Sequence, residues 1–251
     1  MAECLFWVAD QGRRMDWAAR ELEEAGRPVT RRLSHACTHL VLPLPVRAEL
    51  SELSPLLAFL GPGKTLLGGR LGELRKPLEA TGARVLDYFE DETLVCANAA
   101  LTAEGAVFVL MNHCTAALSG LPVLVCGRGR IGTLLAGKLR ALGARVTVSA
   151  RKEKDLAMLR AAGFACVRSG DARALPGCRA VFNTVPAAVY TPEQLALAHP
   201  QCVFIDLATA SGLKAPEGRE ILTAPGLPGL YAPETAGRLI GRALLHMLRE
   251  E

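Results

Sequence analysis

Residues 123–152, VLVCGRGRIGTLLAGKLRALGARVTVSARK, decide the fold of this 251-residue chain. An apolar run leads into three glycines, Gly127, Gly129 and Gly132. Apolar residues then recur at helical spacing over 131–142, and a second apolar run follows at 145–149. A strand, a Gly-x-Gly-x-x-Gly turn and a helix in this order are typical of a dinucleotide-binding corner. The alternative is a glycine turn that binds no ligand.

Each glycine has a physical role in such a corner. Gly127 permits the tight turn, Gly129 lets the backbone approach a pyrophosphate, and Gly132 lets the helix pack against the strand. The N–H groups at the start of the helix favour an anion. The predicted cofactor-binding segment is therefore Gly127, Arg128, Gly129, Arg130, Ile131 and Gly132.

The end of the second strand predicts which nucleotide binds. An acid at this position would accept hydrogen bonds from the free ribose hydroxyls of NAD(H). The chain instead has Ser149, Arg151 and Lys152, which offer donors and positive charge to a 2′-phosphate. NADP(H) is therefore favoured over NAD(H). A solvated basic turn is the alternative for Arg151 and Lys152.

Two later strands are expected to end at the same crevice, because ligands of doubly wound sheets bind outside the carboxyl ends of the strands. These strands are predicted at 180–185 and 202–208, and the nicotinamide half is expected beside them. The residues assigned to it are Thr184, Val185, Pro186, Asp206, Leu207 and Ala208, with Asn183 just before them. Asp206 has an alternative interpretation as a cap or turn acid.

The whole chain alternates short apolar runs with helical periods, which predicts an α/β fold with a doubly wound parallel-sheet Rossmann domain. Residues 1–101 show a looser alternation and predict a smaller N-terminal flavodoxin-like α/β domain for substrate or partner binding. A linking helix is expected at 102–119, capped by Thr102, and the Rossmann domain at 120–233. An amphipathic C-terminal helix, 234–251, is expected to pack on the first domain.

Composition excludes several function classes. A formal net charge of +4 without a basic block argues against a nucleic-acid binder. The eight cysteines are scattered without a C-x-x-C pair, which favours reduced thiols, and no metal site is expected, since His35, Cys37 and His39 have no partner cluster. The apolar stretch 105–125 is interrupted by Asn112, His113, Gly120 and Pro122, so no membrane partner is expected.

Several further segments carry a resemblance to a known family. They are Asn98 with Thr102-Ala103-Glu104-Gly105, the segment ending at His113, the glycine corner, Ala150-Arg151, residues 183–186, Asp206-Leu207-Ala208, residues 224–229, and Ala232-Pro233 with Thr235-Ala236-Gly237. From about Asn98 onward the chain resembles the A-subunit family of dipicolinate synthase; residues 1–97 match more faintly. Where the family continues Ser-Arg-Pro-Gly-Gly after Ala208, this chain has Thr209-Ala210-Ser211-Gly212-Leu213.

The resemblance implies a two-domain fold similar to D-2-hydroxyacid dehydrogenases. It implies NADP-dependent oxidation of a dihydrodipicolinate-type ring to dipicolinate during sporulation, in the mother-cell cytoplasm. The implied partners are a small dicarboxylate substrate and a flavoprotein similar to the B-subunit of dipicolinate synthase; a homo-oligomer is also possible.

Residues near the linking helix are the candidates for chemistry on the ring. His113 or Glu104 is the candidate base that removes a proton. Asn98, Thr102 and Gly105 are assigned to the substrate. His113 has an alternative interpretation as a packed hinge residue, and Glu104 as a first-turn acid favoured by the helix dipole.

Two other functions stay open. One is another NADP-dependent oxidoreductase of hydroxy or keto acids, although His199 and His246 do not lie where such enzymes need a histidine. The other is a non-catalytic nucleotide-binding subunit.

Overall fold

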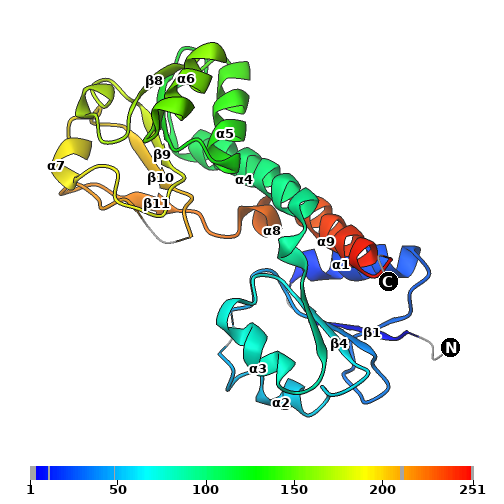
Figure 1. Cartoon of the computed structure of the whole chain (residues 1–251). Helices are drawn as coiled ribbons and strands as arrows, with labels where there is room; N and C mark the ends of the chain where they lie inside the picture. Colours follow the sequence, from blue (N-terminus) through cyan, green and yellow to red (C-terminus); the bar gives the residue numbers. More distant parts are fainter. Residues whose placement is uncertain (1–3, 11, 48, 210–211, 250–251) are drawn as a thin grey trace. The chain divides into compact units, whose positions relative to one another are not determined.

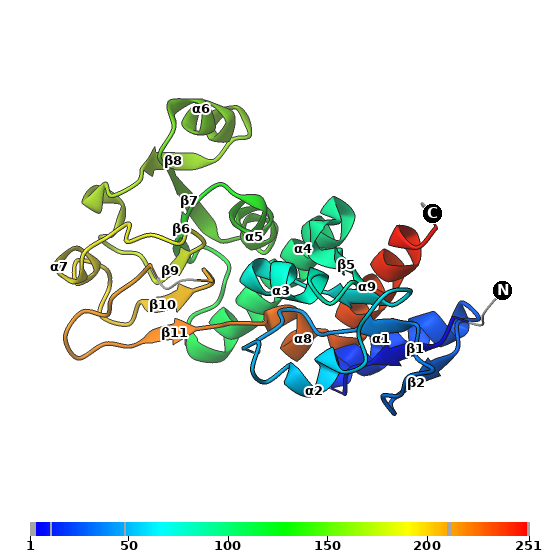
Figure 2. The same cartoon turned by 60° about the horizontal axis from the view of Figure 1, so that its bottom comes forward.

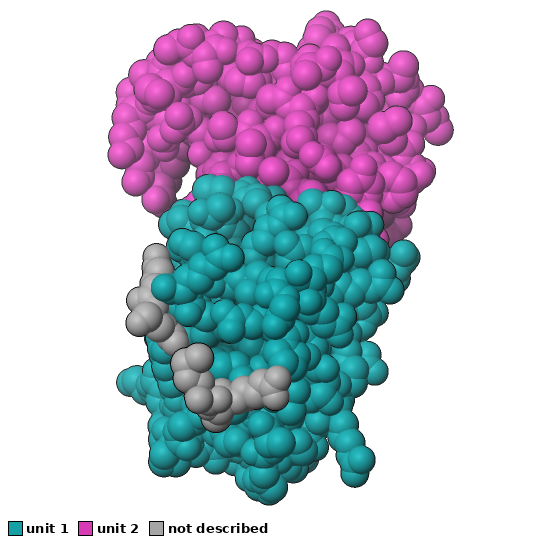
Figure 3. All heavy atoms as spheres, turned by 90° about the vertical axis from the view of Figure 1, so that its right-hand side faces the viewer, with its two compact units in different colours: residues 1–98, 232–251 teal, residues 99–231 magenta. Residues whose placement is uncertain are grey.

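The chain folds into two compact units in this computed structural model, which describes residues 4–10, 12–47, 49–209 and 212–249. Unit 1 comprises residues 1–98 and 232–251, and unit 2 comprises residues 99–231 (Figure 3). Each unit is built on a parallel sheet with helices on its faces, so the predicted α/β fold class is confirmed.

Unit 2 contains a six-stranded parallel sheet (Figures 1 and 2). Its order is β11-β10-β9-β6-β7-β8, which, numbered from β6, is the 3-2-1-4-5-6 order of Rossmann domains. The order reverses between β6 and β9, which pair through Val123 with Ala180 up to Cys126 with Asn183. The strands are β6 (Pro122–Cys126), β7 (Arg145–Ala150), β8 (Ala165–Arg168), β9 (Ala180–Asn183), β10 (Val203–Asp206) and β11 (Ile221–Thr223).

The two faces of this sheet have separate cores. Buried residues of α4 (Glu92–His113), α5 (Arg130–Ala141) and α6 (Glu153–Ala161) pack on one face. The short η3 (Ala172–Ala174) and α7 (Pro192–Leu195), with Tyr190 and Leu213, cover the other. Helix α8 (Leu227–Tyr231) packs on α4, where a Cβ on Gly105 would lie 2.9 Å from Leu227 Cβ.

The linking helix starts earlier than predicted. Helix α4 begins at Glu92 because Asp91 Oδ1 accepts hydrogen bonds from the backbone N–H groups of Thr93 and Leu94, at 2.7 and 3.1 Å. Thr102 therefore lies inside the helix, buried, and the prediction that it caps the helix is wrong. The helix ends at His113, whose Nδ1 lies 2.8 Å from the Val109 carbonyl oxygen, an interaction that suits a last helical turn.

Helix α4 is also the one candidate membrane span within the described ranges. It is long and apolar enough by length and composition, and 44% of its most apolar 18-residue window is buried. Its residues Ala103, Ala106 and Leu110 are fully buried in the core of unit 2. A single helix of this kind is weak evidence for a membrane, because core helices meet the same criterion.

Unit 1 contains a five-stranded parallel sheet in the order β2-β1-β3-β4-β5. Flavodoxin-type sheets have this order; the flavodoxin-like assignment stays a prediction. The strands are β1 (Phe6–Val8), β2 (Val29–Thr30), β3 (His39–Val41), β4 (Thr65–Gly68) and β5 (Arg84–Asp87). Helices α1 (Arg13–Glu24) and α9 (Pro233–Met247) cover one face, and α2 (Ser54–Leu57) and α3 (Arg75–Glu79) the other. The sequence pattern did not predict the very short β2 and α2.

Close backbone packing joins the C-terminal helix α9 to α1. A Cβ on Gly237 would collide with the carbonyl oxygen of Arg14, and one on Gly241 would lie 2.5 Å from Glu21 Cβ. Two glycines one turn apart therefore let α9 lie directly against α1. Unit 1 is accordingly built from both ends of the chain.

Candidate nucleotide-binding site

The glycine corner follows β6 at the point where the strand order of unit 2 reverses. Gly127 has a φ of +106°, which side-chain-bearing residues rarely adopt, and a Cβ there would lie 2.6 Å from Thr184 Oγ1. A Cβ on Gly132 would collide with the carbonyl oxygen of Gly127. Both glycines are thus required by close packing between the β6–α5 corner and the segment after β9.

Gly129 differs, because a Cβ built on it would meet nothing within 4 Å. It is exposed and immediately precedes α5, whose first N–H groups have no partner within the helix. Open space in front of a helix N-terminus suits a pyrophosphate. The corner therefore fits the phosphate part of a dinucleotide, and the residues that would hold it are those of the segment 127–132.

The end of β7 differs from the prediction at one residue. Ser149 is fully buried, because strand alternation puts it beside Cys126, its register partner, on the face that carries Tyr190. Its hydroxyl is therefore not open to a ligand, and its assignment to the 2′-phosphate is wrong for this structure. Arg151 and Lys152 follow β7 and are exposed, as such a contact requires.

Two further charged residues at this edge were not predicted from the sequence. Asp155, in the first turn of α6, accepts a hydrogen bond from Arg128 Nη1 at 3.2 Å. Arg168 ends β8 in register with Ala150 and is exposed. Their position could have been inferred from the parallel strand pattern, since strands 145–149 and 164–167 end at the same edge.

Asn183 and Asp206, at the ends of β9 and β10, form a buried polar network. Asn183 Nδ2 donates to Asp206 Oδ1 at 3.0 Å, and the same oxygen accepts the N–H of Ala208 at 3.0 Å. Asp206 Oδ2 accepts the N–H groups of Gly212 and Leu213 at 2.8 and 3.1 Å. Asp206 is 3% exposed and accepts backbone N–H groups of the loop that follows β10, which agrees with its alternative interpretation as a turn acid. Ala210 and Ser211 lie outside the described residues.

The segments after these two strands remain accessible. Thr184 N and Oγ1 both donate to the carbonyl oxygen of Cys126, at 3.0 and 2.8 Å, which ties β9 to the glycine corner. Val185 is half-buried and Pro186 exposed, and Leu207 and Ala208 are half-buried. Thr184 and Val185 thus stand next to the corner, as the sequence predicts.

His113 lies at the other edge of the same sheet. It lines a hollow of about 400 Å³ together with Cys202, Val203 and Glu220, which stand at the amino ends of β10 and β11. The glycine corner follows the carboxyl end of β6, and all these strands are parallel. Sheet length therefore separates His113 from the corner, so the structure does not bring it together with the nucleotide-binding residues, and its role as the base stays a prediction.

Glu104 is also placed away from the corner. Its Oε1 accepts a hydrogen bond of 2.8 Å from Lys138 Nζ, which joins α4 to α5. Lys138 lies eight residues beyond the start of α5, about 12 Å along the helix axis from its N-terminus. Glu104 is not a first-turn acid of α4, which starts at Glu92, and it does not lie at the corner. Its role as a base stays a prediction.

The three residues assigned to substrate all lie inside α4. Thr102 is buried in unit 2. Gly105 packs closely against Leu227 of α8, which leaves no room for a ligand there. Asn98 is half-buried and is the last residue of the first segment of unit 1. Gly105 therefore has a packing role, whereas Asn98 and Thr102 stay predictions.

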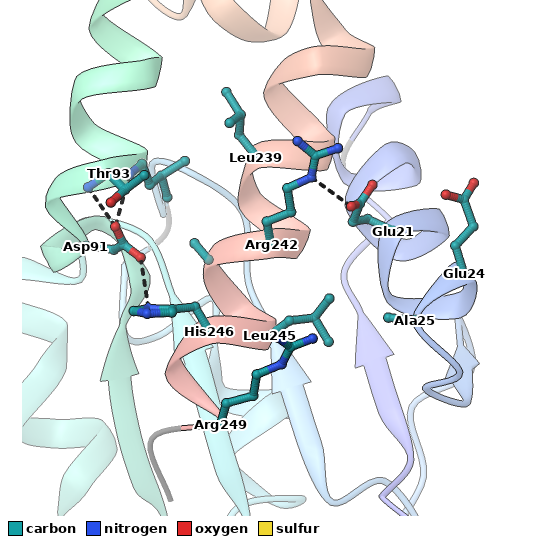
Figure 4. Close-up of a pocket in the computed structure, with 12 residues that line it drawn as sticks. Glu21, Glu24, Ala25, Asp91, Thr93, Leu239, Arg242, Leu245, His246 and Arg249 are labelled. Carbon is teal, nitrogen blue, oxygen red and sulfur yellow. Dashed lines mark hydrogen bonds and ion pairs between the residues drawn. The ribbon is translucent and has the colours of Figure 1, made fainter.

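A hollow of about 630 Å³ lies in unit 1 between α1, α9 and the start of α4 (Figure 4). Arg242 Nε donates to Glu21 Oε1 at 2.9 Å, and His246 Nδ1 lies 3.6 Å from Asp91 Oδ2. Burial alone would raise the pKa of Glu21, but hydrogen bonds from Arg242 and Arg238 outweigh it and lower that pKa. The charged groups that line this hollow join α9 to α1 and cap α4, so the hollow is not the candidate nucleotide-binding site.

Among the residues whose placement is described, no group of three or more His, Cys, Asp or Glu side chains could hold a metal ion. His39 is stacked on Phe6, with ring centroids 4.4 Å apart, and burial lowers its pKa.

Comparisons with known proteins agree with this geometry. Over 173 residues, which are 66% of the chain, it is 30% identical to the A-subunit of dipicolinate synthase from Bacillus subtilis. The resemblance to this dipicolinate synthase family is confirmed. The match covers 58% of that relative's length. The crystal structure of the corresponding protein from Bacillus halodurans, also a dipicolinate synthase A-subunit, has a TM-score of 0.82 at 23% identity, covering 99% of this chain and 98% of that one.

Solved structures with lower TM-scores include a transhydrogenase and an alanine dehydrogenase. A transhydrogenase from Sinorhizobium meliloti has a TM-score of 0.71 at 16% identity, covering 97% of this chain and 92% of that one. No protein-family model matches the chain. The fold is thus the one found in the dipicolinate synthase A-subunit structures and in related oxidoreductases.

Proposed function

We propose that the chain is an NADP-dependent oxidoreductase of the dipicolinate synthase A-subunit type. The observation that carries this proposal is the glycine corner at the switch point of a 3-2-1-4-5-6 sheet, with Arg151 and Lys152 after the neighbouring strand. The similarity to dipicolinate synthase adds a substrate class, a planar cyclic dicarboxylate of the dihydrodipicolinate type.

In this reaction the ring loses a hydride and a proton and becomes aromatic, and a bound nicotinamide nucleotide supplies the hydride acceptor. The chain's own task is to bind and orient. Backbone N–H groups at the start of α5 hold the pyrophosphate, and Arg151 and Lys152 bind the 2′-phosphate. The segments Thr184–Pro186 and Leu207–Ala208 line the nicotinamide half.

A titration of the purified chain with NADPH and NADH tests the nucleotide assignment. NADPH should bind more tightly, and Arg151→Ala should reduce its affinity about tenfold, or about 1.4 kcal/mol, because a charge-assisted contact to phosphate is lost. NADH affinity should stay the same. If neither nucleotide binds the wild-type chain, the proposal fails.

A second candidate is a nucleotide-binding subunit without catalysis of its own. The positions of His113 and Glu104 favour it, because neither predicted base lies beside the corner. Turnover of a dihydrodipicolinate-type substrate, measured with and without the B-subunit-like flavoprotein, separates the two candidates. Turnover by the chain alone excludes the second, whereas NADPH binding without turnover in either mixture supports it.

Residence in the mother-cell cytoplasm of a sporulating bacterium is part of the same proposal, as is assembly with the B-subunit-like flavoprotein or with further copies of this chain. Expression confined to sporulating cells, and co-purification with the flavoprotein, are the observations that check these parts.

A further inference from the structure

The ion pair between Arg128 and Asp155 joins the ends of two adjacent strands. Arg128 follows β6 inside the glycine corner, and Asp155 lies in the first turn of α6, after β7. Arg128 Nη1 lies 3.2 Å from Asp155 Oδ1, and the two side chains are only 28% and 26% exposed. The guanidinium is therefore held at the carboxyl edge of the sheet, where Cys126 and Ser149 are register partners.

This position is close to the basic turn that follows β7. The backbone N–H of Asp155 donates to the carbonyl oxygen of Lys152 at 3.0 Å, so Asp155 lies one turn from Lys152. Asp155 thus links the Arg128 guanidinium to the helical turn that begins at Lys152, directly after Arg151. In a Rossmann sheet the adenosine ribose lies at the end of the second strand, here β7.

We propose that Arg128 is a specificity-determining residue that binds the 2′-phosphate of NADP(H), with Asp155 as the residue that positions it. This inference rests on the proposed function. The 2′-phosphate is then bound from two sides, by Arg128 from the β6 corner and by Arg151 and Lys152 from the β7 turn.

The chemistry of the guanidinium supports this assignment. A guanidinium carries five N–H donors in a planar fork, and the hydrogen bond to Asp155 uses one of those on Nη1. Among the described residues Arg128 has no other side-chain hydrogen bond, so its remaining donors can bind a phosphate, which matches the fork. A partly buried, pre-positioned arginine is also screened less by salt than the exposed Arg151 and Lys152.

A purely structural ion pair makes a different prediction. If Arg128 only tied α6 to the corner, its replacement would change affinity for every adenine nucleotide alike. The informative quantity is therefore the ratio of affinities for two ligands that differ only in the 2′-phosphate. Adenosine 2′,5′-bisphosphate and adenosine 5′-monophosphate are such a pair.

The experiment is a calorimetric titration of the full chain with both ligands, for the wild type, Arg128→Gln and Arg128→Lys. Arg128→Gln should reduce the affinity for the bisphosphate about tenfold to a hundredfold, as expected for a hydrogen bond to a charged group, and leave the monophosphate within about twofold. Arg128→Lys keeps the charge but not the fork and should lose less. Arg145→Gln, which removes an exposed arginine at the amino end of β7, is the matched control and should change neither.

The outcomes separate this inference from the proposed function. A wild-type chain that binds neither ligand, nor NADPH or NADH, refutes the proposed function. Two results overturn the role of Arg128 but leave the proposed function intact. One is a preference for the bisphosphate that stays the same in both Arg128 variants, and the other is an equal loss of affinity for both ligands. The role of Arg128 is supported if the ratio of bisphosphate affinity to monophosphate affinity falls in Arg128→Gln and partly recovers in Arg128→Lys. Arg128→Lys carries the test if Arg128→Gln does not fold.

Discussion

Asn183 and Asp206 tie the ends of two neighbouring strands of unit 2 through a buried hydrogen bond of 3.0 Å, from Nδ2 to Oδ1. Asn183 is fully buried and also donates to the carbonyl oxygen of Val185 at 2.8 Å. The pair therefore fixes the backbone of both segments that are assigned to the nicotinamide half.

Asp206→Ala is expected to destabilise unit 2 because it removes the acceptor of Asn183 Nδ2 and of the backbone N–H groups of Ala208, Gly212 and Leu213. Each buried donor left without a partner costs about 1–3 kcal/mol, so a total loss of about 3 kcal/mol is expected after partial relaxation. Urea unfolding of the variant measures it. Unchanged stability combined with lost nucleotide binding would contradict the structural role and point to direct ligand contact.

The glycines of the corner should respond differently to alanine. Gly132→Ala puts a methyl group against the Gly127 carbonyl oxygen and should cost about 1–3 kcal/mol of folding stability. Gly129→Ala meets nothing within 4 Å at a φ of −73°, so stability should change by less than about 0.5 kcal/mol. The methyl group of Gly129→Ala would occupy the space meant for pyrophosphate, so NADPH affinity should fall although the protein stays folded.

Thermal unfolding and NADPH titration of both variants check this contrast. Gly137, an interior residue of α5 with nothing within 4 Å, gives the control, since Gly137→Ala should leave binding unchanged and stabilise the helix by about 0.5–1 kcal/mol. Full NADPH affinity in Gly129→Ala would show that the pyrophosphate does not approach this glycine.

Three buried thiols make stability depend on pH in the alkaline range. Burial raises the pKa of Cys126 and Cys202 to about 12 and that of Cys178 to about 11, from an ordinary value of 9.0. The unfolded chain releases these protons above about pH 9 whereas the folded chain keeps them. Stability is therefore fully present below pH 9 and falls as the pH rises toward 11 and 12, by about 1 kcal/mol per thiol at pH 10.

Urea unfolding between pH 8 and pH 10 measures this loss. Cys126→Ala should reduce the loss of unfolding free energy between pH 8 and pH 10 by the contribution of one thiol. Replacement of the exposed Cys96 by alanine should leave that loss unchanged. An identical decline in Cys126→Ala and wild type would show that the Cys126 thiol does not contribute.

The sequence predicted the glycine corner well because its roles are local. Gly127, Gly129 and Gly132 act through turn geometry and through the strand and helix directly beside them. The placement of Ser149 failed because its exposure depends on which face of β7 meets Tyr190 and the rest of the second core. The start of α4 was misplaced because the apolar pattern of 102–118 is stronger than the cap signal at Asp91.

The catalytic candidates lie away from the corner for a longer-range reason. His113 and Glu104 are separated from the corner by the length of the sheet and of α5, and no sequence pattern states at which edge the end of α4 lies. The partnership of Arg128 with Asp155 was likewise invisible, because 27 residues separate them in the chain.

By itself the sequence determined the α/β class, the strand–glycine–helix corner and the basic turn after the second strand, since hydrophobic periodicity and glycine spacing are local properties. Only the tertiary structure decided the strand order with its reversal beside the corner, the edge of the sheet on which each polar residue lies, and the packing of α9 on α1. These depend on contacts between segments far apart in the chain, which are selected by shape and burial rather than by neighbouring residues.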